Sequence, residues 1–524
     1  MATSKRNMKG DDQEPVAHDG PKPIYTVEFS KEEIAGEERR PKRKVAVMIG
    51  YCGSGYSGLQ VMHNVKTIES EIFGAFVAAG AISKANADEP KKVQLVRCAR
   101  TDKGVHAAGN VLSLKLIIED ENIVQKINDH LPEQIRVWGI EQTVNSFSSY
   151  QQCDSRIYEY LIPTHCFLPP HPQTFLGKKL DEFAEEAADV ENYRARQEDI
   201  KDFWAETEEK YIRPVLEGMD PELRERVVQS IFSGTETDSK DGKIVVDPDN
   251  STGEQNPSST EGTEIVTGGQ EPSNKPATHS SLESDIKSVK AAYLQAKLAY
   301  RIGPHRLARV KSAFNNYVGT KRYHNYTIRK QFNDPSCKRH IKSFAVHGEP
   351  FLIGDLEWLS LKVHGQSFMM HQIRKMVSMA TMIVRCGAHE DRMQESFESP
   401  KWTIPRAPAL GLLLERPIFD AYNKYGRHKG ANGRNEIEFD KHQKEIDAFK
   451  QKEIYERMWK DEAEQQVFAN LFGGLDSMRS PQLLWASSLG IKAVGRNIDG
   501  AVNIDNALEE EEEGQQPDAG DEEG

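Results

Sequence analysis

The chain has 524 residues, of which 37% are hydrophobic and 28% charged, enough for one large domain or two smaller ones. It holds no apolar run of the roughly 20 residues that span a bilayer, and no signal-peptide core, so we expect neither a membrane nor a secreted protein. Its six cysteines include no CxxC pair, which indicates free thiols in a reducing compartment and argues against a metal site.

The net charge of -13 is unevenly distributed along the chain. Residues 509–523 hold nine acidic residues and no basic one, and residues 234–285 hold eleven acidic and three basic ones. The rest of the chain is therefore mildly basic, with a net charge of about +4. A mildly basic body is compatible with RNA binding, although many unrelated proteins share it.

Residues 1–43 are polar and charged and predict a disordered N-terminal arm. The arm runs into a basic cluster at residues 39–44. Such a cluster is typical of a nuclear import signal, of a phosphate contact or of a solvated tail beside the first strand. We take the first of these as the basis for expecting the protein in the nucleus. The early acidic residues Asp11, Asp12 and Glu14 argue against a mitochondrial transit peptide.

The first half of the ordered region is predicted to span residues 44–233. An apolar run at residues 45–49 predicts a strand that ends in the glycine-rich stretch 50–58. Thr67 can cap a helix that Gly80 would end, and its apolar face is formed by Ile68, Ile72, Phe76 and Ala79. Further strands are predicted at residues 93–98, 110–116, 135–143 and 156–162.

A segment rich in serine, glycine and acidic residues, 234–285, predicts a disordered insertion, because a structureless loop of this length is rare inside a compact domain. The second half, residues 286–425, is predicted to contain a helix after Pro304, strands at 341–347, 358–363 and 409–414, and a helix at 370–385. A helical extension, 436–475, and a disordered acidic tail, 476–524, follow. This mixture of helices and strands is that of an α+β domain.

The loop between the strands predicted at 93–98 and 110–116 crowds Arg100, Asp102, Lys103 and His106 together. A carboxylate beside an arginine and a lysine stays ionised, with a lowered pKa, which favours a nucleophile or a base over a proton donor. On these residues alone, a hairpin turn in which Asp102 caps the bend is the stronger explanation.

Four further segments change that balance when they are taken together with the string RTDKGVHA at residues 100–107. They are a glycine loop, a strand with arginine and tyrosine, a helix with His-Gln-Ile-Arg, and an apolar closing strand, at residues 49–60, 153–160, 368–377 and 409–414. In this order the five segments resemble the TruA family of tRNA pseudouridine synthases. The insertion, the basic arm and the C-terminal helix resemble the eukaryotic branch of that family.

The resemblance implies two pseudo-symmetric halves, with mainly antiparallel sheets flanked by helices around a central, positively charged RNA-binding cleft. It implies that Asp102 is the catalytic residue. Arg100 would displace the target base and then pair with Asp102, and Tyr158 would stack on the flipped uracil. Arg374 would hold Asp102, and Leu412 would line the pocket. We interpret His106, His324 and His371 as structural.

The implied reaction converts uridine to pseudouridine in tRNA, after the uridine has left the stack. It needs no cofactor and no metal, and the sequence holds no Walker loop or dinucleotide motif. Whether Asp102 attacks C1′ or the base, or removes a ribose proton, stays open, as do snRNA and mRNA as further substrates. The C-terminal helix would cover the surface that bacterial relatives use to dimerise, which implies a monomer.

Other functions compete with this one. A glycosidase could use Asp102, but no second carboxylate in a matching motif is evident. A non-catalytic RNA-binding or tRNA-folding protein fits the basic body, but it would not need Arg100, Asp102, Tyr158 and Arg374 together. Within the family, an enzyme that modifies the anticodon arm is a further alternative.

Overall fold

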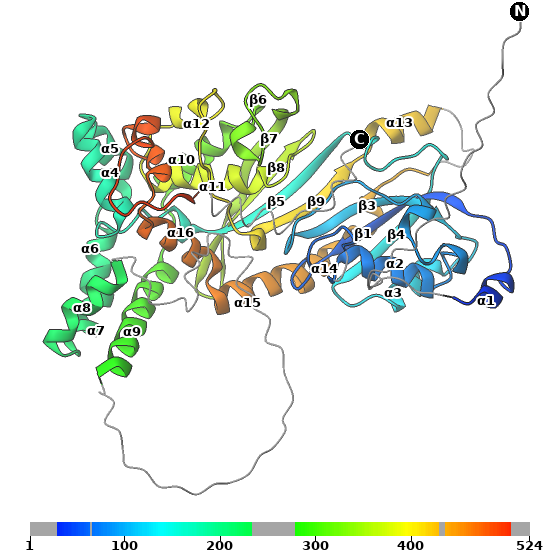
Figure 1. The fold of residues 1–524 in the computed structure, drawn as a ribbon, viewed down its shortest axis with the longest axis horizontal. Coiled ribbons are helices and arrows are strands. Elements are labelled where there is room, and N and C mark those ends of the chain that lie inside the picture. The colour runs from blue at the N-terminus through cyan, green and yellow to red at the C-terminus, as the bar shows by residue number, and fades with distance from the viewer. Residues whose placement is uncertain (1–28, 63–64, 233–277, 429–434, 505–524) are drawn as a thin grey trace, which may run out of the picture.

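A computed structural model describes residues 29–62, 65–232, 278–428 and 435–504. Its central element is a nine-stranded sheet with the strand order β4-β1-β3-β9-β5-β8-β7-β6, and β2 pairs with β3 beside this path. The strand pairs are antiparallel except β3 with β9, which is parallel. Figure 1 shows this sheet running through the molecule with helices packed on it. The predicted α+β class with mainly antiparallel strands is confirmed.

The predicted strands lie close to their expected positions, with two local differences, and β6 was not predicted. Residues 90–93 form a 3-10 turn that begins at Pro90, so the strand expected at 93–98 shrinks to two residues. Residues 409–411 also form a 3-10 turn, and the closing strand starts at Leu412. The strands are β1 (Arg43–Tyr51), β2 (Val96–Arg97), β3 (His106–Leu116), β4 (Ile135–Gln142), β5 (Ser155–Pro163), β6 (Gly319–Arg322), β7 (Lys338–Ile353), β8 (Leu356–Gly365) and β9 (Leu412–Ile418).

The division of the chain at residue 233 does not divide the sheet. Strand β5 belongs to the first half of the sequence, yet it pairs with β8 and β9 of the second half. Strand β9 in turn pairs with β3 of the first half, with His106 opposite Leu413. Because β9 offers backbone groups on both of its edges, it joins the two halves into one continuous sheet.

The predicted helices α2 (Ile68–Ala78), α10 (Pro304–Asn315) and α11 (Gln372–Arg385) are present, and α3 (Ile123–Asp129) packs near α2. The Thr67 hydroxyl caps α2 by accepting a hydrogen bond from the Ser70 amide at 3.3 Å, as its position in the sequence indicated. All 14 residues of α11 are buried, so this helix lies inside the body rather than on its surface.

Residues 175–232 and 278–299 form helices that the sequence analysis did not assign: α4 (Phe175–Glu186), α5 (Val190–Gln197), α6 (Phe203–Thr207), the π-helical η5 (Glu208–Ile212), α7 (Arg213–Glu217), α8 (Pro221–Phe232) and α9 (Thr278–Ala299). A small separate core of Ile212, Val227 and Val289 joins η5, α8 and α9. The predicted insertion is therefore corrected at its end, because α9 already begins at residue 278. Residues 233–277 lie outside the described residues.

The C-terminal extension consists of α14 (Gln443–Phe449), the π-helical η11 (Lys450–Tyr455), α15 (Glu456–Gln465) and α16 (Val467–Ser477). Lys450 Nζ lies 2.7 Å from Glu415 Oε2 and 3.3 Å from Glu159 Oε2, and Tyr455 donates a hydrogen bond to Glu159. Burial raises the pKa of Glu159, but Lys450 and its hydrogen-bond donors outweigh burial and lower it overall. The extension is thus held on the sheet through β5 and β9.

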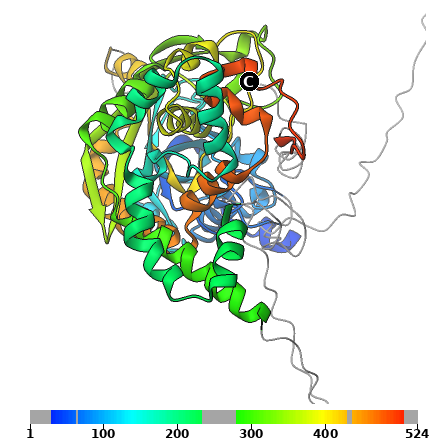
Figure 2. The ribbon, with the colours of Figure 1, turned by 90° about the vertical axis from the view of Figure 1, so that its left-hand side faces the viewer.

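The tail predicted as disordered from residue 476 is corrected for residues 476–504. The 3-10 helices η12 (Pro481–Ala486) and η13 (Gly490–Ala493) follow α16, and Trp485 is fully buried, with its Nε1 donating to Thr403 O at 2.9 Å. Figure 2 shows this C-terminal segment packed beside α4. Its apolar side chains explain the difference, since the acidic run starts only at Glu509, outside the described residues.

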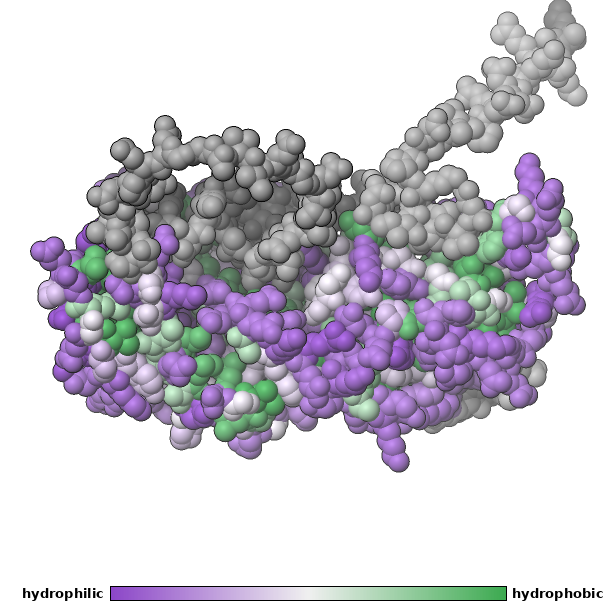
Figure 3. All heavy atoms as spheres, turned by 90° about the horizontal axis from the view of Figure 1, so that it is seen from below, coloured by the Kyte–Doolittle hydropathy of each residue, from purple (hydrophilic) through white to green (hydrophobic). Residues whose placement is uncertain are grey.

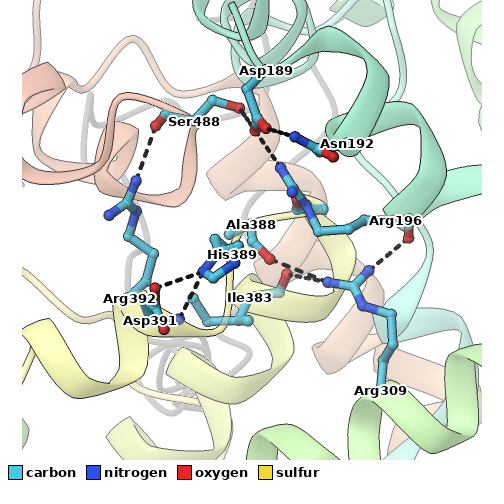
Figure 4. A network of polar contacts seen from close by, with 11 residues as sticks. Asp189, Asn192, Arg196, Arg309, Ile383, Ala388, His389, Asp391, Arg392 and Ser488 are labelled. Carbon is cyan, nitrogen blue, oxygen red and sulfur yellow. Dashed lines mark hydrogen bonds and ion pairs between the residues drawn. The ribbon is translucent and has the colours of Figure 1, made fainter. Parts of the chain in front are cut away.

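Polar contacts fix the same C-terminal segment (Figure 4). The Ser488 hydroxyl donates to Asp189 Oδ2 at 2.8 Å, and Arg392 of α12 (Asp391–Glu395) donates to Ser488 O at 2.9 Å. Asp189 also pairs with Arg196 of α5, so three distant parts of the sequence meet there.

At the other end of the chain, the predicted arm is corrected for residues 29–43. The short helix α1 (Lys31–Ala35), capped by Ser30, lies within them, and Arg43 and Lys44 belong to β1. Residues 1–28 lie outside the described residues.

No described helix is long and apolar enough to cross a membrane. Figure 3 shows a largely hydrophilic face on the lower side of Figure 1, with apolar side chains in small groups.

Candidate active site

Asp102 lies in a tight turn between β2 and β3. The Val105 amide donates a hydrogen bond to Asp102 O at 3.1 Å, and Gly104 supplies the positive φ of +77° that the turn requires. The turn uses the backbone of Asp102 and leaves its carboxylate for another contact, which it makes with His371 at the N-terminal end of α11.

Neighbouring elements hold this loop in place. The Thr101 hydroxyl lies 2.8 Å from the Tyr51 hydroxyl of β1, and the Leu59 amide donates to Thr101 O at 3.1 Å. Arg156 of β5 donates to Cys98 O at 2.7 Å. Contacts from β1, β5 and Leu59, which follows the glycine-rich stretch, thus fix the backbone that leads into Asp102, which suits a side chain that must be positioned accurately.

The glycine-rich stretch 50–58 is explained by how closely it approaches the catalytic loop. A Cβ atom at Gly53 would lie 2.2 Å from Val105 O, and one at Gly58 would lie 2.9 Å from Thr101 O. Neither backbone atom can move without displacing the loop. Side chains at these two positions would therefore push the segment that carries Asp102.

The carboxylate of Asp102 contacts His371, the residue that precedes α11. Asp102 Oδ2 lies 3.0 Å from His371 Nδ1, and the Asp102 side chain stays 28% exposed. Burial raises the pKa of Asp102, but His371, Arg374 and Arg406 together outweigh burial and lower it. The site therefore presents an ionised carboxylate that a substrate can still reach.

Arg374 lies one turn along α11 and is 2% exposed. Its Nε donates to Ala407 O at 2.6 Å, and the Ala407 amide donates back to Arg374 O at 3.3 Å. Its charge lowers the pKa of Asp102 across the site. Arg374 is thus buried within the body, as is the rest of α11.

Tyr158 and Leu412 lie on the adjacent strands β5 and β9. Tyr158 is 7% exposed, and its ring packs edge-on against Phe368 with 5.3 Å between the ring centroids. Burial raises the pKa of its hydroxyl, as does the nearby charge of Asp102. Leu412 is buried opposite Tyr160, whose hydroxyl donates to Pro408 O at 2.8 Å and marks Tyr160 as a core residue.

Arg100 is the predicted site residue that the structure does not bring to Asp102. Its side chain is exposed and forms no hydrogen bond or ion pair with another residue of the described ranges.

Lys375, next to Arg374, is buried and donates to Thr327 O at 3.1 Å. The described residues also contain no group of His, Cys, Asp and Glu that could hold a metal ion.

Sequence reasoning missed two residues of the site, His371 and Arg406. His371 was interpreted as structural, although it stands three positions before Arg374 and so shares a helix face with it. Arg406 lies between two prolines in an extended segment before β9, where nothing local marks it. It is 1% exposed, and its Nη1 lies 3.2 Å from His371 Nε2.

Known proteins match the chain over the elements that form this site. A family model described as tRNA pseudouridine synthase matches residues 313–420, from α10 to β9. A Schizosaccharomyces pombe protein named tRNA pseudouridine synthase 1 is 38% identical over 524 residues, which cover 93% of each chain. The chain belongs to the TruA family of tRNA pseudouridine synthases.

Other TruA-family proteins agree with this membership. The Yarrowia lipolytica tRNA pseudouridine synthase 1 is 43% identical over 84% of this chain and 76% of its own. A Saccharomyces cerevisiae protein named tRNA pseudouridine(27/28) synthase is 34% identical over 72% of this chain and 84% of its own. As a TruA-family synthase, the protein is an isomerase that converts uridine to pseudouridine in tRNA.

Proposed function

We propose that Asp102 is the catalytic residue of this isomerisation and acts as an ionised carboxylate on a uridine flipped out of the tRNA. The observation that carries the proposal is its carboxylate, which is bound by His371 on one oxygen, has a lowered pKa and stays partly exposed. An ionised carboxylate can attack the substrate or accept a proton from it. Both routes use the same oxygen and the same flipped base.

The flipped base needs an apolar place to lie. Leaving the stack costs a few kcal/mol, and stacking on a protein ring returns roughly 1–3 kcal/mol. Tyr158 offers a ring near Asp102, and Phe368 holds that ring edge-on. We assign the stacking contact to Tyr158 and the apolar wall to Leu412, whose strand β9 lies beside β5.

Arg374 and Arg100 have different roles in the proposed reaction. Arg374 is buried on α11 and keeps Asp102 ionised, which supports the role of holding the aspartate. Arg100 is exposed two residues before Asp102. In the proposal it enters the RNA, displaces the target base and pairs with Asp102 afterwards. Its lack of a partner among the described residues fits a side chain that waits for substrate.

RNA binding is proposed to occur across a basic cleft between the two halves, through phosphate contacts and recognition of shape. The exposed Arg329 and Lys330 support this, since their loop is tied to the start of α11 by the Thr327 hydroxyl, which donates to Met370 O at 3.0 Å. Recognition by shape would admit structured snRNA and mRNA segments as further substrates besides tRNA.

We also propose that the protein acts in the nucleus as a monomer. Residues 39–42 are exposed and basic except for Pro41, as an import signal requires, whereas Lys44 is buried in β1. The extension from α14 to α16 covers part of the sheet body, which leaves less surface for a second copy. Exclusion from the nucleus after Arg39→Ala/Arg40→Ala, and a single 59.1 kDa mass in solution, are the expected results.

The deciding experiment follows tritium release from tRNA that carries tritium at C5 of uridine. The wild-type protein should release tritium, because C5 loses its hydrogen when the new C–C bond forms, and Asp102→Ala should not. Filter binding of the same tRNA should give dissociation constants within about threefold of each other. Equal release by both proteins would remove Asp102 from the chemistry, and release by neither, with tight binding, would favour a binding protein.

A further inference from the structure

His371 lies between the proposed catalytic aspartate and the buried guanidinium of Arg406. Its Nδ1 lies 3.0 Å from Asp102 Oδ2, and its Nε2 lies 3.2 Å from Arg406 Nη1. The side chain of His371 is 2% exposed, so water does not compete for either ring nitrogen. The three residues come from the catalytic loop, the start of α11 and the segment before β9.

The chemistry of Arg406 decides which nitrogen of His371 carries the proton. A guanidinium has five N–H donors and no acceptor, so a hydrogen bond to it requires a lone pair on Nε2. The single proton of the neutral imidazole must then sit on Nδ1, which faces Asp102. A doubly protonated ring would instead point an N–H at the guanidinium and place two cations about 3 Å apart in a buried site.

The backbone at His371 supports a functional origin for this contact. His371 has a φ of +58°, in the left-handed region that residues other than glycine and asparagine adopt at a cost. Its carbonyl nevertheless starts α11 by accepting from the Lys375 amide at 3.0 Å. Such strain persists where surrounding contacts impose it, and here it directs the imidazole at Asp102.

We propose that His371 is a positioning residue: a neutral imidazole, protonated on Nδ1 because Arg406 occupies Nε2, that donates to one oxygen of Asp102 and leaves the other for the uridine. The inference rests on the proposed role of Asp102. By fixing one oxygen, His371 sets the direction of the second, and a misplacement of about 1 Å at a reacting group can lower a rate about 100-fold. Arg406 acts indirectly, because it determines which ring nitrogen of His371 carries the proton.

Single-turnover assays on full-length variants test the role of the side chain. Glycine adopts a positive φ without strain, so His371→Gly removes the imidazole alone. Its rate should fall about 100-fold, with the dissociation constant for tRNA changed less than threefold. Asparagine also tolerates this backbone and places its amide nitrogen near the position of Nδ1, so His371→Asn should regain at least about tenfold of the loss.

Two matched controls sharpen this result. His371→Gln places its amide nitrogen near Nε2 instead and should not regain the rate. Arg406→Lys keeps a pure donor and should lose less than Arg406→Gln, whose oxygen can accept a hydrogen bond from a protonated Nε2 and so permits the other tautomer. Equal rates for the glycine, asparagine and glutamine variants of His371 would overturn the positioning role.

A spectroscopic measurement tests the tautomer without relying on activity. In protein labelled with ¹⁵N-histidine at pH 7, one ring should show a protonated Nδ1 and an unprotonated Nε2, and His371→Asn should abolish that signal. A His371 ring protonated on Nε2 would overturn the inference even in an active enzyme. If Asp102→Asn keeps its rate in the same assays, the proposed function fails, and the inference fails with it.

Discussion

Helix α11 has a contact between a basic side chain and an aspartate at each end, and the two contacts differ in how much solvent reaches them. At its N-terminal end, His371 binds Asp102, whose side chain is 28% exposed. At its C-terminal end, Arg385 binds Asp476 of α16 through two guanidinium nitrogens, with side chains 4% and 9% exposed. Arg385 also donates from Nε to Cys166 O at 3.2 Å.

The difference separates the carboxylate that we propose to be reactive from a structural one. Asp476 accepts hydrogen bonds on both oxygens from one partner, so it has no oxygen to offer a substrate. Asp102 contacts His371 through one oxygen, Oδ2, and its side chain keeps an exposed side. The same helix therefore has a closed pair that fixes its position and an open contact that holds the carboxylate of the proposed catalytic residue.

Removing the charge of the open carboxylate should have the largest effect on catalysis. Asp102→Asn should lower the single-turnover rate by about 1000-fold or more, because an amide can neither attack nor accept a proton as a carboxylate does. The melting temperature should change by only a few degrees, since the amide keeps the shape and one acceptor. Calorimetry beside the rate assay checks both, and unfolding at room temperature would place Asp102 with the structural residues.

Removing the charge of the closed carboxylate should do the reverse. Asp476→Asn leaves Arg385 buried beside a neutral group, which should lower the free energy of unfolding by about 3–5 kcal/mol in a urea titration. Turnover of the folded fraction should stay near that of the wild type.

The matched control is Asp440→Asn, whose carboxylate pairs with Arg416 but is 82% exposed, and which should cost less than about 1 kcal/mol. Similar losses for the two variants would show that the pair at the end of α11 is no more important than a surface pair.

The stacking contact should contribute less than either aspartate. Tyr158→Ala should lower the rate roughly 5- to 150-fold, the equivalent of 1–3 kcal/mol of base stacking. Tyr158→Phe keeps the ring and should stay within about threefold. A phenylalanine variant as slow as the alanine variant would assign the chemistry to the hydroxyl instead of the ring.

The rate of the wild-type protein should depend little on pH, and the dependence should increase once the positive charge of Arg374 is removed. The pKa of Asp102 is lowered in the folded protein, so the stabilisation from its charge is present above about pH 4 and is lost as the pH falls through the folded value. Rates between pH 5 and 8 should therefore show no acid limb from Asp102. Arg374→Met should move that limb to higher pH, and an unchanged profile would show that Arg374 does not act on Asp102.

The smallest effect is expected far from α11, at the insertion. Replacing residues 233–277 with a short glycine-serine linker should leave turnover within about twofold, since α8 and α9 pack through Val227 and Val289. Extending the deletion to residue 285 removes the start of α9 and should lower the melting temperature. A fall in activity with the shorter deletion would give the insertion a role in RNA handling.

Local patterns predicted the strands other than β6 and the helices α2, α10 and α11, but not the helices from α4 to α9. Alternation located β3, and the Thr67 cap located the start of α2, because both depend on neighbours in sequence. The motif around Asp102 located the catalytic loop through family resemblance. The contact of Arg406 with His371 joins residues 35 apart and leaves no periodic trace, so it could not be predicted. Trp485 was missed similarly, because a short 3-10 segment buried by distant partners resembles a loop.

The parallel pairing of β3 with β9 has a consequence for synthesis of the protein. Strand β3 ends at Leu116 and its partner β9 begins at Leu412, so the ribosome adds about 300 residues before the part of β3 at His106 and Ala107 is paired, whereas β2 pairs with the same edge earlier. At about 5–20 residues per second this takes roughly 15–60 s, during which an apolar strand edge is open to aggregation. The loop of Asp102 and the helix that follows His371 can meet only near the end of this interval. The sheet that carries the loop of Asp102 is therefore complete only after β9 has been made.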